Sequence, residues 1–176
     1  MKTVASVFLA CLALALAVPA GAVIPENVLE VGNARLKVLA WTIYDSTLFS
    51  RDGEFRGIEP GLILDINYRR NISRQALLKR TRLEWQRQGI ARKQHTQWLA
   101  ELEALLPGIT KGDRITLVVG ESLSSTFYFN GQQIGAMQDP DFTRDFLAIW
   151  LSENTSYPRV RDKLVGLGDE ERVQRR

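Results

Sequence analysis

The sequence predicts an α+β domain with a mainly antiparallel sheet and helices packed on one face. Three observations support this prediction. Segments typical of strands occur within residues 35–68 and 115–137, helical periodicity fills residues 73–106 between them, and a second helical region covers residues 139–167. Because runs of strands alternate with runs of helices, the order favours an antiparallel sheet over a parallel one.

The strand predictions depend on composition and on alternation. Residues 35–49 are rich in Val, Ile, Trp, Tyr and Thr, which predicts one or two strands. In the next strand the apolar residues recur at every second position and share one face: Leu62, Leu64, Ile66 and Tyr68. Further strands are predicted at residues 115–119, 125–129 and 132–137, and Asn130-Gly131 predicts a two-residue hairpin turn between the last two.

Capping residues mark the helices. Ser73 is a predicted N-cap, and Gly89 ends the first helix. The second helix has an apolar face of Trp98, Leu99, Leu102, Leu105 and Leu106. Asp139 caps the third helix, with Pro140 in its first turn, and a last helix is predicted from Pro158 to about Leu167.

The first 22 residues are predicted to be a cleavable signal peptide, which implies a periplasmic or secreted protein. Lys2 is followed by an apolar run from Val4 to Val18, and Ala20-Gly21-Ala22 has the small-x-small pattern of a cleavage site. Two alternatives are a retained membrane anchor, for which the run is short of the roughly 20 residues required, and a lipoprotein acylated at Cys11. Cleavage after Ala22 removes Cys11, the only cysteine.

The remaining residues, 23–176, are predicted to form a single domain with a core at about 27–168 and a frayed, charged tail. The formal net charge of the whole chain is +3, but residues 69–93 carry nine cations and one acid, Glu84. This Arg69–Lys93 segment is interpreted as a solvated helix face or as a surface for anionic lipid or an acidic ligand. No nucleic-acid motif accompanies it, so no nucleic-acid partner is predicted.

Motifs for cofactor, metal or nucleophilic chemistry are missing from the sequence. There is no P-loop, dinucleotide fingerprint or nucleophile elbow. The single histidine, His95, has no metal-ligand spacing to another His or a carboxylate, and we expect it to be solvated. The sequence therefore predicts no cofactor and no metal.

An ordered set of local motifs spans residues 31–151. They are Val31–Lys37, Ile43–Phe49, Tyr68–Ser73, Leu106-Pro107 with Lys111–Asp113, Phe127–Gly131 with Ile134-Gly135, and Phe146–Leu151. In order and spacing this set resembles the chalcone isomerase-like superfamily, specifically its exported bacterial branch. The resemblance implies an open-faced β-sandwich, in which helices cover one face of a large sheet, and a ligand cleft between sheet and helices.

The superfamily contains isomerases that close a flavanone ring and non-catalytic relatives that bind fatty acids. The resemblance assigns ligand binding to Arg35, which matches the arginine that holds the substrate oxyanion in the enzymes, and to Tyr44, which matches the fatty-acid-binding relatives. The further Tyr and Asn of the enzymes have no match between Asn71 and Gln88. No catalytic residue is therefore assigned.

The spacing of the two residues leaves their arrangement open. Arg35 and Tyr44 are an odd number of residues apart, so in one regular strand they would point to opposite faces. They share a cleft only if a bulge or break intervenes; otherwise Arg35 is a surface residue.

The leading hypothesis from the sequence is an exported protein that binds a small apolar or acidic ligand, such as a fatty acid, without catalysis. The alternatives are an intramolecular lyase acting on a phenolic or enone substrate and an envelope interaction module that uses the basic helix face.

Overall fold

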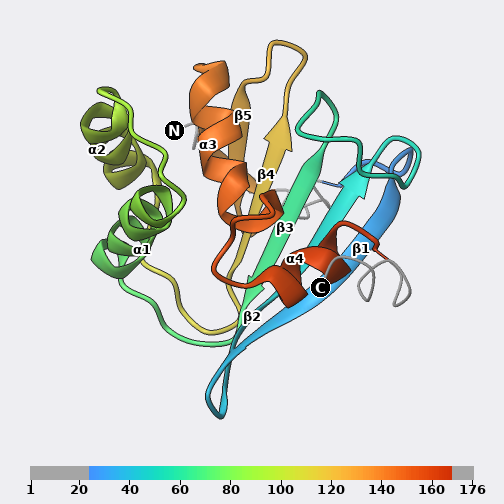
Figure 1. Ribbon diagram of the computed structural model, residues 1–176, viewed down its shortest axis with the longest axis horizontal. Helices are drawn as coiled ribbons and strands as arrows, with labels where there is room; N and C mark the ends of the chain where they lie inside the picture. The colour runs from blue at the N-terminus through green and yellow to red at the C-terminus, as the bar shows by residue number, and fades with distance from the viewer. Residues whose placement is uncertain (1–23, 168–176) are drawn as a thin grey trace, which may run out of the picture.

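The computed structural model describes residues 24–167, in which six strands form one sheet and four helices pack against it. The elements are β1 (Leu29–Val38), β2 (Trp41–Ser50), β3 (Ile63–Tyr68), α1 (Arg74–Arg87), α2 (His95–Leu105), β4 (Arg114–Val119), β5 (Ser125–Phe129), β6 (Gln132–Met137), α3 (Pro140–Leu151) and α4 (Pro158–Leu164). All four helices lie on the same side of the sheet (Figure 1). This confirms the predicted α+β class and the open-faced sandwich. The predicted signal peptide and charged tail lie outside the described residues.

The strands follow chain order across the sheet, and every neighbouring pair is antiparallel. Cross-strand partners share a face, so the register separates two kinds of residue. One row of partners carries Arg35, Asp45, Asn67 and Arg114 and lies on the uncovered face. The adjacent row carries Ala34, Ser46, Ile66 and Ile115 and lies against the helices. In these two rows the sheet is therefore polar on its open face and apolar beneath the helices.

The region predicted as one or two strands forms a long hairpin of β1 and β2. It starts at Leu29, six residues before the predicted start at Arg35, and turns at Leu39-Ala40. β2 pairs with β3 only from Tyr44 onward. The turn of the hairpin therefore projects beyond the rest of the sheet (Figure 1).

Capping and turn residues in the sequence correctly predicted most other ends of helices and strands. The Ser73 hydroxyl accepts a hydrogen bond from the Ala76 amide, and the Asp139 carboxylate accepts one from the Asp141 amide, so both predicted N-caps are confirmed. Asn130 and Gly131 have φ angles of 50° and 84°, as the predicted hairpin turn requires. The last helix ends at Leu164, three residues before the predicted Leu167.

A buried aromatic cluster joins the helices. Trp85 of α1 is fully buried, and its Nε1 donates to the Asp145 carbonyl of α3 over 2.9 Å. His95 stacks on the Trp85 ring with centroids 4.3 Å apart, and its side chain is 17% exposed. The expectation that His95 is solvated was therefore wrong. The prediction failed because the polar neighbours of His95 in sequence do not show that its ring turns toward α1.

α4 closes the layer by packing on β1. At Gly32 the two elements are so close that a Cβ atom would lie 2.2 Å from the Lys163 carbonyl oxygen and 3.0 Å from that of Leu164. The glycine within the Val31–Lys37 motif is thus explained by close backbone contact, because any side chain would push α4 outward.

Candidate ligand-binding cavity

A cavity of about 390 Å³ lies between the sheet and the helices α1 and α3. Its volume is within the range of about 300–1,000 Å³ that is usual for small-molecule sites. Apolar side chains from β1–β5, α1, α3 and the loops before α1 and after α2 form most of its wall: Leu36, Val38, Ile43, Leu64, Ile66, Ile72, Ala76, Leu77, Leu106, Ile115, Leu117, Phe127, Phe146 and Ile149. The alternation predicted for residues 62–68 supplies one part of this wall, since Leu64, Ile66 and Tyr68 all line the cavity.

The exposure of the lining residues locates the opening of the cavity. Most of them are buried or half-buried, but Val38, Ala76 and Arg80 are exposed. Val38 is at the end of β1, next to the hairpin turn, whereas Ala76 and Arg80 are one helical turn apart on α1. The opening therefore lies between the hairpin and the first half of α1.

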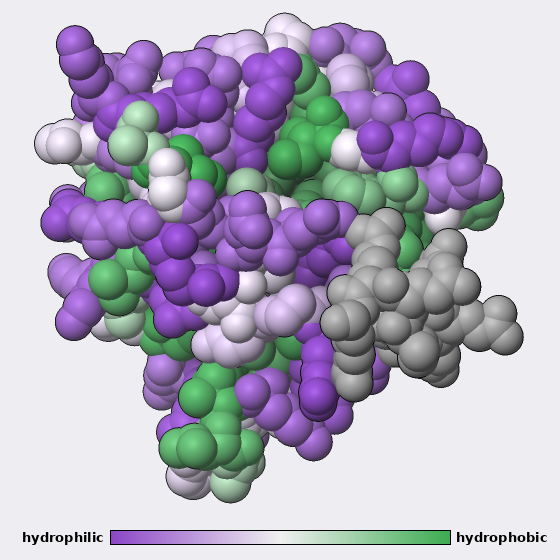
Figure 2. All heavy atoms as spheres, viewed as in Figure 1, coloured by the Kyte–Doolittle hydropathy of each residue, from purple (hydrophilic) through white to green (hydrophobic). Residues whose placement is uncertain are grey.

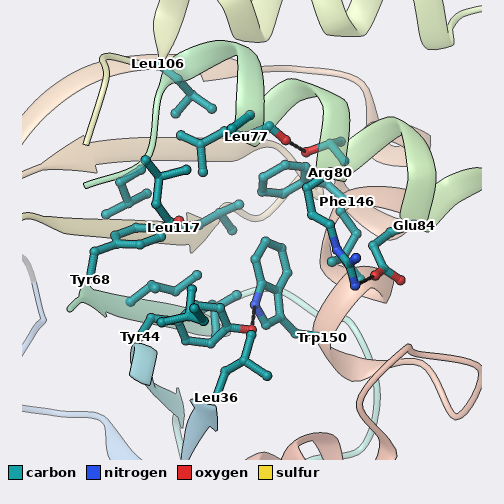
Figure 3. Close-up of a pocket in the computed structure, with 18 of the residues that line it drawn as sticks. Leu36, Tyr44, Tyr68, Leu77, Arg80, Glu84, Leu106, Leu117, Phe146 and Trp150 are labelled. Carbon is teal, nitrogen blue, oxygen red and sulfur yellow. Dashed lines mark hydrogen bonds and ion pairs between the residues drawn. The ribbon is translucent and has the colours of Figure 1, made fainter. Parts of the chain in front are cut away.

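Tyr44 lines the cavity from β2, as the resemblance implied for a ligand-binding residue. Its hydroxyl oxygen accepts a hydrogen bond from Trp150 Nε1 over 3.0 Å (Figure 3). Burial raises the pKa of this hydroxyl well above its ordinary value of 10. The group therefore stays protonated at neutral pH, and its own proton is available to a ligand oxygen.

Tyr68 contributes a second hydroxyl. Its side chain extends into the cavity from β3 (Figure 3), and the residue is only 6% exposed. Burial raises the pKa of this hydroxyl too, with a smaller effect of the nearby Tyr44. In the part of the chain that the structure describes, no protein group forms a hydrogen bond with it. The hydroxyl borders the cavity, so a ligand oxygen there can accept its hydrogen bond.

The charged part of the lining is a pair on α1. Arg80 forms an ion pair with Glu84, four residues later, and the Arg80 guanidinium lies 5.3 Å from the centre of the Tyr157 ring. Glu84 is 2% exposed and also accepts a hydrogen bond from the Ser156 hydroxyl over 3.0 Å. Arg80 is 48% exposed and stands at the opening. Its guanidinium has five N–H donors, more than Glu84 uses, so it can also bind an anionic group.

Arg35 is not among the residues that line the cavity. It forms a 2.5 Å ion pair with Asp45 on the open face of the sheet, and its side chain is 56% exposed. Arg69 also pairs with Asp45, over 2.6 Å, and the hydrogen bonds from Arg35 and Arg69 hold the pKa of this carboxyl below its usual value.

The register explains this separation. Arg35 faces Asp45 and its neighbour Leu36 faces Tyr44, so Arg35 and Tyr44 lie on opposite faces of the sheet. The structure therefore does not bring together the two residues predicted to bind one ligand. The lyase alternative combines an anion hole near Arg35 with a positioned hydroxyl such as Tyr44, and these two side chains lie on opposite faces of the sheet.

Neither Arg80 nor Tyr68 was predicted to be a site residue. One signal for Arg80 was present, because Glu84 is the only acid in the Arg69–Lys93 segment and lies four residues after it on the same helix face. The cations of that segment are exposed apart from the half-buried Arg92, as expected for a solvated face, and some of them also form ion pairs. Arg87 lies 3.9 Å from Glu84, and Arg92 lies 2.8 Å from Asp141 and 2.5 Å from Asp145.

Within residues 24–167 there is no group of three or more His, Cys, Asp or Glu side chains arranged to hold a metal ion. No helix in the same range has the length and hydrophobicity needed to cross a membrane.

The chain is similar to a known protein family and to two known proteins. The model of the chalcone isomerase-like family matches residues 59–166, so the chain belongs to this family. Its fold is similar to the crystal structure of an Arabidopsis thaliana fatty-acid binding protein, with a TM-score of 0.61 over 84% of this chain and 90% of that chain at 12% identity. An uncharacterized protein of Haemophilus influenzae is 24% identical over 138 residues, which cover 77% of this chain and 67% of that protein.

Proposed function

We propose that the cavity binds an elongated apolar acid of the fatty-acid type, with its chain against the sheet and its acidic group at Arg80. The observation that carries the proposal is the 390 Å³ apolar cavity whose opening is lined by an exposed arginine. Each methylene group removed from water contributes about 0.8 kcal/mol, so a chain of several methylenes supplies most of the affinity. The name of the structural neighbour, a fatty-acid binding protein, agrees with this proposal.

The polar groups have separate roles in the proposed complex. Arg80 keeps its contact with Glu84 and donates its remaining N–H groups to the carboxylate of the ligand. Tyr68 lies on the far side of the cavity from Arg80 (Figure 3), and its hydroxyl is available to a second oxygen on the ligand. This arrangement replaces the predicted Arg35 anchor with a cation on the covered side of the sheet.

A blocked opening tests whether the cavity is the binding site. Ala76→Trp places a large ring at the opening, and Ala100→Trp makes the same change at an exposed position of α2 outside the cavity. Delipidated protein is titrated with a fluorescent fatty-acid analogue. We expect Ala76→Trp to weaken binding by at least tenfold and Ala100→Trp to leave it unchanged. Equal binding by both variants would refute the cavity as the site.

The acidic group is tested by comparing a fatty acid with the alcohol of the same chain length. Arg80→Gln is expected to weaken binding of the acid by about tenfold and binding of the alcohol by less than twofold, because a charge-assisted hydrogen bond is lost only with the acid. Arg82→Gln, on the same helix but outside the lining, is the matched control. The double variant Arg80→Gln/Glu84→Gln also removes the buried carboxylate that lost its ion pair with Arg80, and it must show the same selective loss of acid binding as Arg80→Gln. An unchanged ratio of the two affinities would place the acid elsewhere.

We also propose that the protein is exported and works outside the cytosol, as a member of the exported bacterial branch. The support is the sequence of residues 1–22, with a cation, an apolar run and a small-x-small site. Expression of the full chain in a bacterial host should yield periplasmic protein whose N-terminus is Val23. Recovery of uncleaved protein from the cytosol would contradict this proposal.

A further inference from the structure

The turn of the β1–β2 hairpin is apolar and exposed. Residues 24–167 include five exposed large hydrophobic residues, and three of them, Val38, Leu39 and Trp41, are in or next to this turn. Leu39 is 94% exposed and Trp41 is 59% exposed. Figure 2 shows the turn as a hydrophobic protrusion at the lower end of the molecule.

The hairpin turn requires a positive φ angle at a position that a leucine occupies. Leu39 has a φ angle of 54°, in the left-handed region where glycine and asparagine are comfortable and leucine is not. An exposed leucine at such a position stabilises neither the turn nor the core. Strain that is retained at an exposed site points to a role for the side chain outside the folded domain.

Cations line a groove next to this apolar turn. An open groove of about 620 Å³ beside it is lined by Trp41, Thr42, Asn71 and four cations, Arg35, Arg69, Arg70 and Lys111. The Arg70 guanidinium lies 4.2 Å from the centre of the Trp41 ring. Asp45 pairs with both Arg35 and Arg69 but cancels only one of the four positive charges, so the local charge stays positive. The groove therefore offers a positive surface directly next to exposed Leu and Trp side chains.

We propose that this hairpin turn docks on an anionic lipid surface, with Leu39 and Trp41 in the boundary between headgroups and acyl chains and the cations on the lipid phosphates. Charge complementarity and shape favour a membrane. The turn protrudes as a narrow apolar tip, tryptophan is enriched at membrane interfaces, and basic residues near the surface strengthen binding to anionic lipid. The proposal moves the predicted membrane contact from the basic face of α1 to the end of the hairpin.

The docking surface adjoins the opening of the cavity. Val38 belongs to both, since it lines the cavity and is 39% exposed at the turn. A docked molecule would therefore hold the opening of its cavity at the level of the lipid. The transfer of an acyl ligand between membrane and cavity rests on the function proposed above, whereas docking does not.

Co-sedimentation with vesicles tests the docking. Vesicles of phosphatidylcholine alone are compared with vesicles containing 30% phosphatidylglycerol, at low and high salt. We expect binding only to the anionic vesicles and a large loss of binding at high salt. Leu39→Asn suits the left-handed φ angle and should fold well; we expect it to weaken binding at least tenfold, while Leu83→Asn, at an exposed leucine of α1, leaves it unchanged. Arg70→Glu replaces a cation with an anion, so it should weaken binding more than the roughly fivefold expected for loss of one cation. Arg82→Glu makes the same change outside the groove and should leave binding unchanged.

Three results would overturn the proposal. The first is equal vesicle binding by wild type and Leu39→Asn. The second is equal binding to neutral and anionic vesicles. The third is a concentration-dependent dimer that Leu39→Asn abolishes without any vesicle binding, which would identify the turn as a contact between two copies of the chain. Ala76→Trp separates the two proposals, because it should weaken ligand binding at least tenfold and should not weaken vesicle binding.

Discussion

The contact between α4 and β1 predicts that Gly32→Ala destabilises the protein. An alanine Cβ at this position would lie 2.2 Å from the Lys163 carbonyl oxygen, whereas ordinary contacts of this kind begin at about 3.3 Å. Since the obstacle is backbone, α4 must move outward by about 1 Å. That shift loosens the packing of Leu164, which is fully buried, and the hydrogen bond of 3.1 Å from Arg161 Nε to the Leu151 carbonyl.

The size of the effect follows from two opposing contributions. Overpacking of this kind costs about 1–3 kcal/mol. Replacing glycine by alanine also restricts the unfolded chain, which returns about 0.4–1 kcal/mol. We expect a net loss of about 1–2 kcal/mol in the free energy of unfolding. For a chain of this length the loss lowers Tm by about 2–8 °C.

Gly108→Ala is the matched control. At Gly108 an added Cβ meets nothing within 4 Å, and the residue has no positive φ angle, so only the effect on the unfolded chain remains. Its stability should be unchanged or raised by about 0.5 kcal/mol. Urea unfolding followed by circular dichroism measures both variants. If Gly32→Ala proves as stable as Gly108→Ala, the close contact of α4 with β1 is refuted.

Two further predictions concern buried polar groups. Trp150→Phe removes the donor to the Tyr44 hydroxyl and should lower the free energy of unfolding in urea by about 1–3 kcal/mol. Adding Tyr44→Phe should recover part of this loss, because the hydroxyl is then no longer left without its donor. If the effects of the two substitutions simply add, the hydrogen bond is contradicted. Burial raises the pKa of Asp65 above its ordinary 3.8, so the folded state binds this proton more tightly than the unfolded state and wild-type stability falls as pH rises through that range. Asp65→Asn keeps an acceptor for the Thr116 hydroxyl but does not titrate. The free energy of unfolding of this variant relative to wild type should therefore increase from pH 3 to pH 7. A constant difference would show that burial does not destabilise the Asp65 carboxylate.

Signals within a few residues of the chain were sufficient for most helices and strands. Ser73 and Asp139 cap their helices, and Asn130-Gly131 forms its turn, because each depends on contacts between neighbouring residues. The turn at Leu39-Ala40 could not be predicted in the same way. It contains no turn-forming residue, and the pairing of β1 with β2 forces Leu39 into its positive φ angle.

Only part of the candidate site could be predicted from the sequence, because the rest depends on contacts between distant segments. The alternation of residues 62–68 already predicted one apolar face, and the motif around Tyr44 predicted a cleft residue, which lies in the cavity. Whether Arg35 shares that cleft depends on strand register, which is set by pairing between distant segments. The same holds for Arg80 and Glu84. Their spacing is visible in the sequence, but only the packing of α1 over the sheet buries Glu84 and places Arg80 at the opening, because burial is a property of the assembled layers.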